Sequence, residues 1–372
     1  MNVSEEAVVL GSRTTSGVHC VQHPRVLFMA PEAGNGEGSA QKARALAGNL
    51  ASDGWTVYSE TGEMSTSGRN SCRSRHSLFQ LSWLRRFIRS FPKYDVIHFI
   101  ADTPASFWLF AAPAMAMAKF FGKKAVLSFA PVTSEVFLDR WAWLAHPVFR
   151  MADRLLVDSE YLVRVFARSG LQVDCIAIPF DLSGLEYHEA AAMQPVILVD
   201  RSLEKVNNVA CLIRAFKFVK QKYPRSELMI VGDGHQRRAL EYLVSSGNIH
   251  GVTFLGNVGR NDKAALYRQA DIYVNSSSVD GTPESILRAL VTGLPVVTTD
   301  AGGIPHLVSD RVNGLVVAVN NHVAMAERII ELVENPDLAK VLVERGRADS
   351  ERFHWRSIGS SWRQYYQSLV SS

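Results

Sequence analysis

The sequence predicts an α/β protein made of two successive doubly wound units. From residue 24 onward, short apolar runs alternate with stretches of helical periodicity, and this alternation pauses once, over residues 181–195, before it starts afresh. Continuous apolar strands between helices are typical of parallel sheets that are covered on both faces. The length of 372 residues exceeds one ordinary core and suits two domains.

The composition indicates a globular protein that could bind an anionic ligand. Hydrophobic residues make up 47% of the chain and charged residues 20%, and the formal net charge is +4. Such mild basicity suits an anionic small molecule or an acidic membrane surface. This net charge is far smaller than that typical of a nucleic-acid-binding protein, so we expect no nucleic acid partner.

The cysteines and the apolar segments predict a cytoplasmic protein. Cys20, Cys72, Cys175 and Cys211 lie far apart without metal-binding spacing, as expected of free thiols in a reducing compartment. The first residues do not form a signal peptide, and we find no apolar run long enough to span a membrane.

The first unit is expected over residues 24–180, after a flexible tail at 1–23. Its helices are expected at Gln41–Ala51 and Pro104–Phe121. Its strands are expected at Val26–Ala30, Trp55–Ser59, Val96–Phe99, Ala125–Phe129, Arg154–Val157 and Asp174–Ile178.

The second unit is expected over residues 196–354, after the linker at 181–195. A last helix, rich in Trp and Tyr, is expected at 355–372. The strands of the second unit are expected at Val196–Val199, Glu227–Val231, Val252–Leu255, Ile272–Val274, Pro295–Thr298 and Gly314–Val317. Ligands of such sheets bind at the carboxyl ends of the strands.

Glycines follow the first strand of the first unit. Gly34, Gly36 and Gly38 stand between that strand and the next helix, where backbone N–H groups could approach a phosphate. A plain strand-to-helix turn explains the same residues. The match to G-x-G-x-x-G is weak, because Ser39 occupies the place of the third glycine.

Two cations follow the first strand of the second unit. Arg201 and Lys205 stand four residues apart, where they could hold a diphosphate and neutralise charge on a leaving group. Taken alone, such a pair is more often part of a solvated loop. Gly232 and Gly234 follow the next strand, and either a close backbone approach to a ligand or a tight turn explains them.

The most specific motif runs from Asn275 to Leu290. Thr282 is expected as the N-cap of a helix and Pro283 as its first residue. The free amides at this helix start could bind an anionic group, and Asp280 would accept hydrogen bonds from hydroxyls.

The second unit contains, in order, the segments VDRSLEK, LMIVGDG, VTFLGNV, ALYRQADIYVNSS, DGTPESIL, GLPVVTTDAGGIP and NGLVV. Together these segments resemble the donor-binding domain of family-4 retaining glycosyltransferases. The resemblance covers about residues 196–320, and the first unit agrees more loosely. It implies the GT-B fold, in which two Rossmann-like domains face a central cleft and the last helix packs back on the first domain.

The resemblance also implies the roles of individual residues. Arg201 and Lys205 would hold the donor diphosphate without a metal, and Asp280 would orient sugar hydroxyls. Gly256, Asn257 and Val258 would lie near the base. The sugar and phosphates would be cradled by Gly281, Thr282, Pro283, Glu284 and Ser285, with Gly36, Gly232, Gly234 and Arg288 also at the donor. The donor would be a UDP- or GDP-linked sugar, with no separate cofactor.

The sequence departs from the family at three places. A ribose-binding glutamate usually stands eight residues after the first acid, and here that position is Arg288. Either Arg288 forms an i, i+4 ion pair with Glu284, or the donor carries an extra anionic group. No histidine follows Phe129, and His98 reads better as a core residue than as a substitute. His306 stands where relatives often have an acid.

One segment of the first unit could contact a membrane. Leu81 to Phe91 places five apolar side chains on one helical face, with Arg85, Arg86 and Arg89 elsewhere. It could rest on an anionic membrane that holds a lipid acceptor, at the inner face of the membrane, or it could be a helix that faces the core.

The leading hypothesis is therefore a hexosyltransferase that acts on a saccharide or lipid-linked acceptor. A second hypothesis, motivated by Arg288 and the missing histidine, is a catalytically impaired relative that binds a sugar nucleotide or a partner protein. A nicotinamide-dependent oxidoreductase is a distant third.

Overall fold

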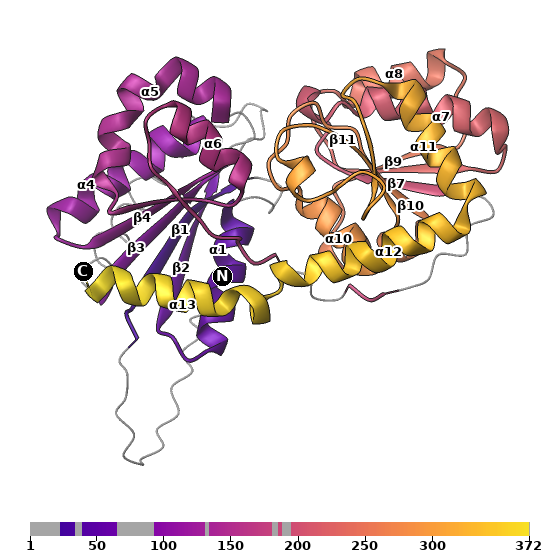
Figure 1. Cartoon of the computed structure of the whole chain (residues 1–372). Helices are drawn as coiled ribbons and strands as arrows, with labels where there is room; N and C mark the ends of the chain where they lie inside the picture. The colour runs from indigo at the N-terminus through magenta and orange to yellow at the C-terminus, as the bar shows by residue number, and fades with distance from the viewer. Residues whose placement is uncertain are drawn as a thin grey trace, which may run out of the picture.

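The computed structural model has two parallel six-stranded sheets, each flanked by helices, and it confirms the predicted α/β class (Figure 1). The structure describes residues 23–33, 39–64, 93–130, 134–180, 185–187 and 195–371. Gly36, the expected helix from Leu81 to Phe91 and most of the expected linker lie outside these ranges.

The first sheet has the strand order β2-β1-β3-β4-β5-β6. Its strands are β1 (Val26–Ala33), β2 (Val57–Met64), β3 (Val96–Ala101), β4 (Lys124–Phe129), β5 (Arg154–Val157) and β6 (Asp174–Cys175). Every pairing is parallel, with Val26 opposite Val96 where β1 meets β3. The predicted strands are all present, although the last is only two residues long.

Helices cover both faces of this sheet. They are α1 (Ser39–Ser52), α3 (Pro104–Ser106), a π-helical segment (Phe107–Ala111), α4 (Ala112–Phe120), α5 (Ser134–Met151) and α6 (Glu160–Arg168). The π segment has a cause in the sequence. Pro113 has no N–H for the carbonyl of Leu109, and the N–H of Ala112 bonds to Phe107, five residues back.

The second sheet has the strand order β12-β11-β10-β7-β8-β9. Its strands are β7 (Val196–Asp200), β8 (Glu227–Val231), β9 (Val252–Gly256), β10 (Ile272–Asn275), β11 (Val296–Thr299) and β12 (Leu315–Val317). The order reverses at β7, whose neighbours are β10 and β8, so the loops after these three strands converge.

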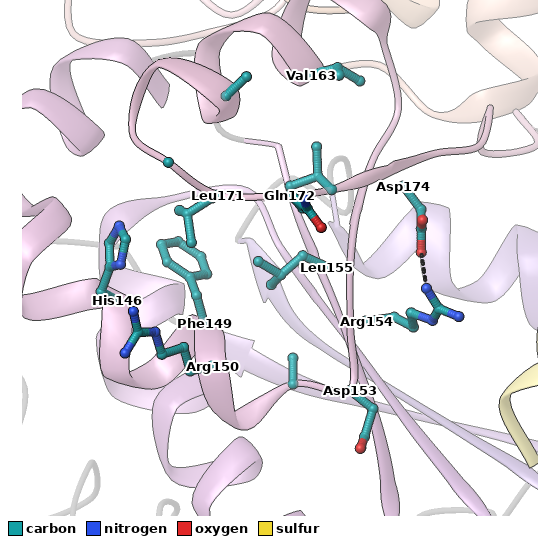
Figure 2. A pocket seen from close by; sticks show the side chains of 14 residues that line it. His146, Phe149, Arg150, Asp153, Arg154, Leu155, Val163, Leu171, Gln172 and Asp174 are labelled. Carbon is teal, nitrogen blue, oxygen red and sulfur yellow. Dashed lines mark ion pairs between the residues drawn. The ribbon is translucent and has the colours of Figure 1, made fainter. Parts of the chain in front are cut away.

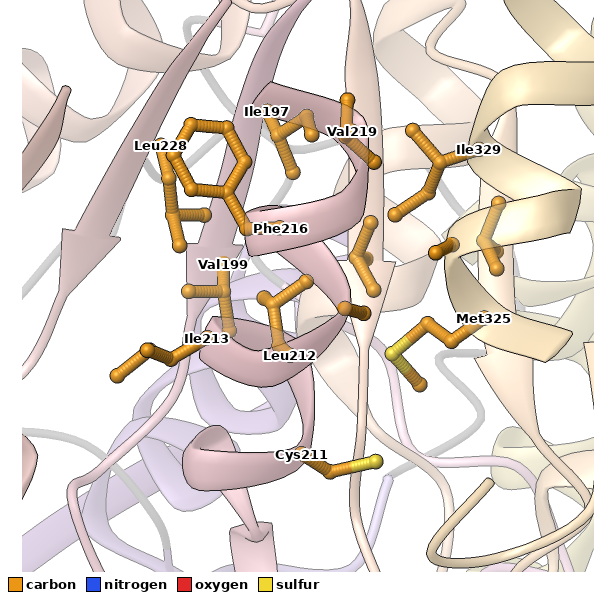
Figure 3. Packing of buried hydrophobic residues seen from close by; sticks show 14 of the residues in the cluster. Ile197, Val199, Cys211, Leu212, Ile213, Phe216, Val219, Leu228, Met325 and Ile329 are labelled. Carbon is orange, nitrogen blue, oxygen red and sulfur yellow. The ribbon is translucent and has the colours of Figure 1, made fainter. Parts of the chain in front are cut away.

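The helices of the second domain are α7 (Val209–Lys222), α8 (Arg237–Ser246), α9 (Arg260–Gln269), α10 (Glu284–Thr292), α11 (His322–Glu334) and α12 (Pro336–Ser350). Figure 3 shows the core on one face of the sheet, where Leu212 and Phe216 of α7 and Met325 and Ile329 of α11 pack near Val199. All of these side chains are buried, which fixes β7 and the loop that follows it.

The last helix, α13 (Trp355–Ser371), returns to the first sheet (Figure 1). Ile358, Trp362, Tyr366 and Leu369 join the buried cluster that also contains Phe28. The indole N–H of Trp362 donates to the carbonyl of Ala177 at 2.9 Å. The helix therefore links the end of the second domain to the core of the first.

His98 of β3 is the polar centre of this contact. Its Nδ1 lies 2.7 Å from the Tyr366 hydroxyl and its Nε2 lies 2.7 Å from the Ser128 hydroxyl. Burial lowers the pKa of His98 to about 3, so the ring stays neutral. The structure thus agrees with the interpretation of His98 as a core residue.

Candidate functional site

The predicted donor residues follow four neighbouring strands of the second sheet. Arg201 follows β7, Gly232 follows β8, Gly256 ends β9, and Asp280 lies after β10. Because β10, β7, β8 and β9 are adjacent and parallel, their carboxyl ends lie side by side. Residues that are up to 79 positions apart are thereby brought to one edge of the sheet.

Arg201 forms a buried ion pair with Asp280. Its Nη2 lies 2.7 Å from Asp280 Oδ2, and the two side chains are 15% and 4% exposed. Arg201 also donates from Nε and Nη2 to Asn207 Oδ1, at 3.0 and 2.6 Å. These bonds use Nε and Nη2. Within the described residues, the N–H groups of Nη1 have no recorded partner and could bind a ligand.

Asn207 is a site residue that the sequence analysis missed. It is 3% exposed, and its amide nitrogen donates to the carbonyl and to the hydroxyl of Ser202, at 2.8 Å each. The backbone carbonyl of Asn207 accepts a hydrogen bond from the Ser276 hydroxyl at 3.1 Å. Asn207 therefore joins the loop after β7 to the loop after β10 and holds the guanidinium of Arg201 at a fixed angle.

Gly232 is required by the backbone of Arg201. Its φ of +118° is in the region that favours glycine, and a Cβ atom there would lie 2.2 Å from the Arg201 carbonyl oxygen. Its N–H donates to the Gly256 carbonyl at 2.8 Å. A Cβ atom at Gly234 would likewise lie 2.6 Å from the Leu203 carbonyl oxygen. In this structure, the close approach that both glycines permit is to the loop that carries Arg201.

Lys205 begins a 3₁₀ turn, Lys205–Asn207, and is exposed. It makes no recorded ion pair with a described residue. On the neighbouring turn, Gly256 is buried, Val258 is partly buried and Asn257 is exposed. Val258 packs against the second core cluster of this domain, so Asn257 is the side chain of that turn that faces solvent.

The loop from Asp280 to Ser285 is fixed by a glycine turn. A Cβ atom at Gly302 would lie 2.1 Å from the Asp280 carbonyl oxygen, and one at Gly303 would lie 2.4 Å from that of Gly281. The N–H of Gly303 donates to Asp280 at 2.9 Å. Asp280 Oδ1 in turn accepts from the N–H of Gly281 at 3.0 Å.

The predicted start of α10 is wrong by one position. Pro283, with ψ of 113°, is the N-cap and Glu284 is the first helical residue. The carbonyl of Pro283 accepts from the N–H of Ile286 at 3.1 Å. The proline ring fixes φ but leaves ψ free to stay extended, so Pro283 precedes the helix here.

Arg288 lies between two carboxylates. Its Nη2 is 2.7 Å from Glu284 Oε1, as the i, i+4 interpretation predicts, and its Nη1 is 3.2 Å from Asp200 Oδ2. Lys263 completes the cluster at 2.9 Å from Asp200 Oδ1. The Tyr267 hydroxyl also lies 3.2 Å from Asp200.

We call Asp200, Lys263, Glu284 and Arg288 the charged cluster. Its side chains are 4%, 12%, 20% and 11% exposed, so its two cations and two anions neutralise one another largely out of water. Asp200 and Lys263 were not foreseen as site residues. The only signal for Asp200 was its place at the carboxyl end of β7, beside Arg201.

Two side chains of the first domain reach the second near this site. The Gln41 amide donates to Glu284 Oε1 at 3.3 Å, and Arg164 Nη2 lies 2.5 Å from His306 Nε2. Burial and the Arg164 guanidinium lower the pKa of His306. At the position where relatives often have an acidic residue, this chain thus has a histidine that contacts the first domain.

Lys42 lies one residue beyond Gln41, on α1. It pairs with Asp158 Oδ2 at 2.8 Å, and the two side chains are 17% and 4% exposed. Burial alone would lower the pKa of Lys42, but the Asp158 carboxylate holds it above its usual value. The first amide of α1, at Ser39, is bound by the Asp102 carboxylate at 2.8 Å, so a side chain of the protein occupies that helix start.

A hollow in the described residues lies elsewhere. It has a volume of about 750 Å³ and is lined by residues near the start of β5 and β6. Figure 2 shows His146, Arg150 and Phe149 around it, with the Arg154–Asp174 ion pair on its far side. Because these are the amino ends of the strands, it is not the place where such sheets bind ligands.

No group of three or more His, Cys, Asp or Glu residues in the described ranges could hold a metal ion. No helix in the same ranges is long and apolar enough to cross a membrane.

Comparison with known proteins finds a family to which most of the second domain is similar. Residues 186–349 match the family described as glycosyl transferases group 1. An uncharacterised glycosyltransferase of Methanocaldococcus jannaschii is 29% identical over 140 residues, which are 38% of this chain and 40% of that protein. The chain thus spans less than half the length of the first curated relatives it matches.

Solved structures match almost the whole chain. Sucrose-phosphate synthase from Thermosynechococcus elongatus superimposes with a TM-score of 0.76 at 19% identity, over 94% of this chain and 99% of that one. HepE from Anabaena, solved with UDP-glucose, has a TM-score of 0.71 at 20% identity, over 93% and 100%. The chain has the GT-B fold, and its residues 186–349 are similar to the group 1 glycosyltransferases.

Proposed function

We propose that the protein moves a hexose from a UDP- or GDP-linked sugar to a saccharide or lipid-linked acceptor. The transfer would retain the anomeric configuration and use neither a metal nor a separate cofactor. The observation that carries this proposal is the guanidinium of Arg201, held by Asp280 and Asn207 at the carboxyl ends of the donor-domain strands. The Anabaena neighbour that was solved with UDP-glucose supports the same class of donor.

Arg201 would stabilise the leaving diphosphate. When the bond between the sugar and the diphosphate breaks, negative charge gathers on the phosphate oxygens. The Nη1 donors of Arg201, the Lys205 ammonium and the first amides of α10 would face that charge. Because Asn207 and Asp280 already hold the guanidinium, little reorganisation is needed during the reaction.

Asp280 would orient the sugar. Its Oδ2 accepts from Arg201 and, at 3.4 Å, from the Asn275 amide, while its Oδ1 accepts from the N–H of Gly281. A carboxylate oxygen has two acceptor directions, so Oδ1 retains one for a sugar hydroxyl.

Lys205 would supply the net positive charge of the site. Arg201 is already balanced by Asp280, and the charged cluster is balanced internally. Lys205 is exposed at the same edge of the sheet and would meet the diphosphate as a solvated point charge. The salt dependence of donor binding would therefore depend on Lys205.

A catalytically impaired, sugar-nucleotide-binding protein is the second candidate. Arg288 favours it, because a cation stands where the resembling family has the carboxylate that binds ribose hydroxyls. In this structure the guanidinium is engaged by Glu284 and Asp200, which argues against a free cation awaiting an extra anionic group on the donor.

A panel of UDP-, GDP- and ADP-sugars tests both candidates. Binding is measured by calorimetry, and release of the nucleoside diphosphate is followed with saccharide and lipid-linked acceptors. Release that Arg201→Ala abolishes and Arg311→Ala retains supports the enzyme; Arg311 pairs with Glu331 and belongs to no part of the proposed site. Binding without release at every acceptor supports the second candidate. Absence of donor binding contradicts both.

A further inference from the structure

The outward face of α4 and the segment before it is apolar. Leu109, Pro113, Ala116 and Phe120 follow one another at intervals of four, three and four residues, which places them on one side of the helix. All four are exposed, Leu109 at 56% and Phe120 at 84%. The opposite side of the same helix, with Ala114, Met115 and Ala118, is buried in the core. This helix therefore has apolar side chains both toward the protein and toward solvent.

The neighbouring helix α5 extends this apolar face. Its residues Phe137, Leu138 and Phe149 are buried, yet Trp143 is 75% exposed. Leu144 and Trp141 follow at 40% and 38%. Packing among the described residues does not explain an exposed tryptophan on a helix that already has a buried apolar side.

A shallow hollow joins the two helices. It has a volume of about 560 Å³, and Lys119 of α4 lines it together with Trp143, Pro147 and Arg150 of α5. Phe120 stands next to Lys119 in the chain and lies against Phe121, with ring centroids 5.2 Å apart. We call Leu109, Pro113, Ala116, Phe120, Trp143 and Pro147 the α4–α5 face.

Cations line part of the α4–α5 face. Between residues 104 and 151 the chain has five Lys or Arg residues and two Asp or Glu residues. Lys119 and Arg150 lie in the hollow itself, and the Arg140 guanidinium lies 5.7 Å from the ring of Trp141. Two described carboxylates lie near these groups: Asp153 is 3.2 Å from Lys119, and Asp139 is one helical turn before Trp143 on α5. The Lys119 side chain remains half exposed.

We propose that the α4–α5 face binds the surface of an anionic phospholipid bilayer. Exposed Trp and Phe side chains partition into the interface between headgroups and acyl chains, and Lys and Arg beside them meet the lipid phosphates. An apolar stripe that runs along a helix can lie flat on such a surface. In Figure 1, α4 and α5 lie on the side of the first domain that faces away from the second, so the proposed donor site stays free.

The proposal is tested by sedimentation with vesicles of phosphatidylcholine alone and of phosphatidylcholine with phosphatidylglycerol. We expect the full chain to bind the anionic vesicles, and more weakly as salt rises. The double variant Phe120→Ser, Trp143→Ser should lower the partition coefficient by about tenfold or more. Tyr242→Ser is the matched control, because Tyr242 is 72% exposed on α8 of the other domain, and it should bind as the unaltered chain does.

Three results would overturn the proposal. These are no binding to anionic vesicles, an equal loss in the Tyr242→Ser variant, or a double variant that turns a dimer into a monomer in sedimentation velocity. The last result would assign the face to a second copy of the chain. Thermal unfolding and donor binding are measured on the same variants and should not change, since the substituted side chains are solvent-exposed and outside the donor site. Vesicle binding and the proposed transfer reaction can thus fail independently.

Discussion

Replacing Arg288 by alanine removes the central cation of the charged cluster. Asp200 would keep Lys263, and Glu284 would keep the Gln41 amide but lose the guanidinium. Breaking a buried ion pair on one side costs about 3–5 kcal/mol. Because Lys263 remains and Glu284 is one-fifth exposed, we expect a loss near the lower end, about 3 kcal/mol of unfolding free energy.

Arg237→Ala is the matched control. Arg237 also contacts two carboxylates, Asp233 at 3.3 Å and Glu241 at 2.8 Å, and it also lies in a helix. Its side chain is 31% exposed and both partners are nearly half exposed, so we expect a loss below about 1 kcal/mol. The comparison tests burial, since both residues are arginines on helices that pair with two carboxylates.

Urea unfolding distinguishes the domains because of where the tryptophans lie. None of the seven tryptophans is in residues 195–354, so their fluorescence follows the first domain and the last helix. Far-ultraviolet circular dichroism follows both domains. Arg288→Ala should move the dichroism midpoint to lower urea and move the fluorescence midpoint less. A loss for Arg288→Ala no greater than that for Arg237→Ala would refute the reasoning from burial.

Three further predictions concern single residues. His98 stays neutral in the folded protein until about pH 3 but takes up a proton near pH 6.5 when unfolded, so stability should fall as pH falls between these values, by about 1.4 kcal/mol per unit. Unfolding of His98→Gln, followed by fluorescence at several pH values, should show a shallower slope. Gly302→Ala should weaken donor binding, measured by calorimetry, because its methyl group would displace the Asp280 carbonyl and φ there is +53°. Lys205→Ala should reduce the salt dependence of donor binding, measured as the slope of log Kd against log salt.

Each of these has a clear contrary result. An unchanged pH slope in His98→Gln would mean that other groups set the acid sensitivity. Donor affinity of Gly302→Ala equal to that of the unaltered chain would mean that the Asp280 loop tolerates the displacement. A salt slope that Lys205→Ala leaves intact would remove Lys205 from the site.

Much of the fold could be predicted because its signals are local. A buried parallel strand is a short apolar run, and helices with buried and exposed sides alternate with such runs, so all the strands could be placed within a few residues. The start of α10 was misplaced by one residue because Pro283 fits equally well as the N-cap and as the first helical residue.

The partners of the site residues could not be predicted in the same way. The ion pair of Arg201 with Asp280 and the bonds of Asp200 to Lys263 and Arg288 exist because β7 lies beside β10. That adjacency depends on the strand order, which periodicity does not reveal. The i, i+4 pair of Glu284 with Arg288 was foreseen because it needs only one helix.

The central claim is that Arg201 binds the diphosphate of a nucleotide sugar. The most direct measurement is calorimetric titration of UDP, GDP and their sugars into the unaltered chain, Arg201→Ala, Arg201→Lys and the control Arg311→Ala. We predict binding of one nucleotide class, with an affinity about a hundredfold weaker in Arg201→Ala, intermediate in Arg201→Lys and unchanged in Arg311→Ala. Equal affinity in folded Arg201→Ala and in the unaltered chain would contradict it.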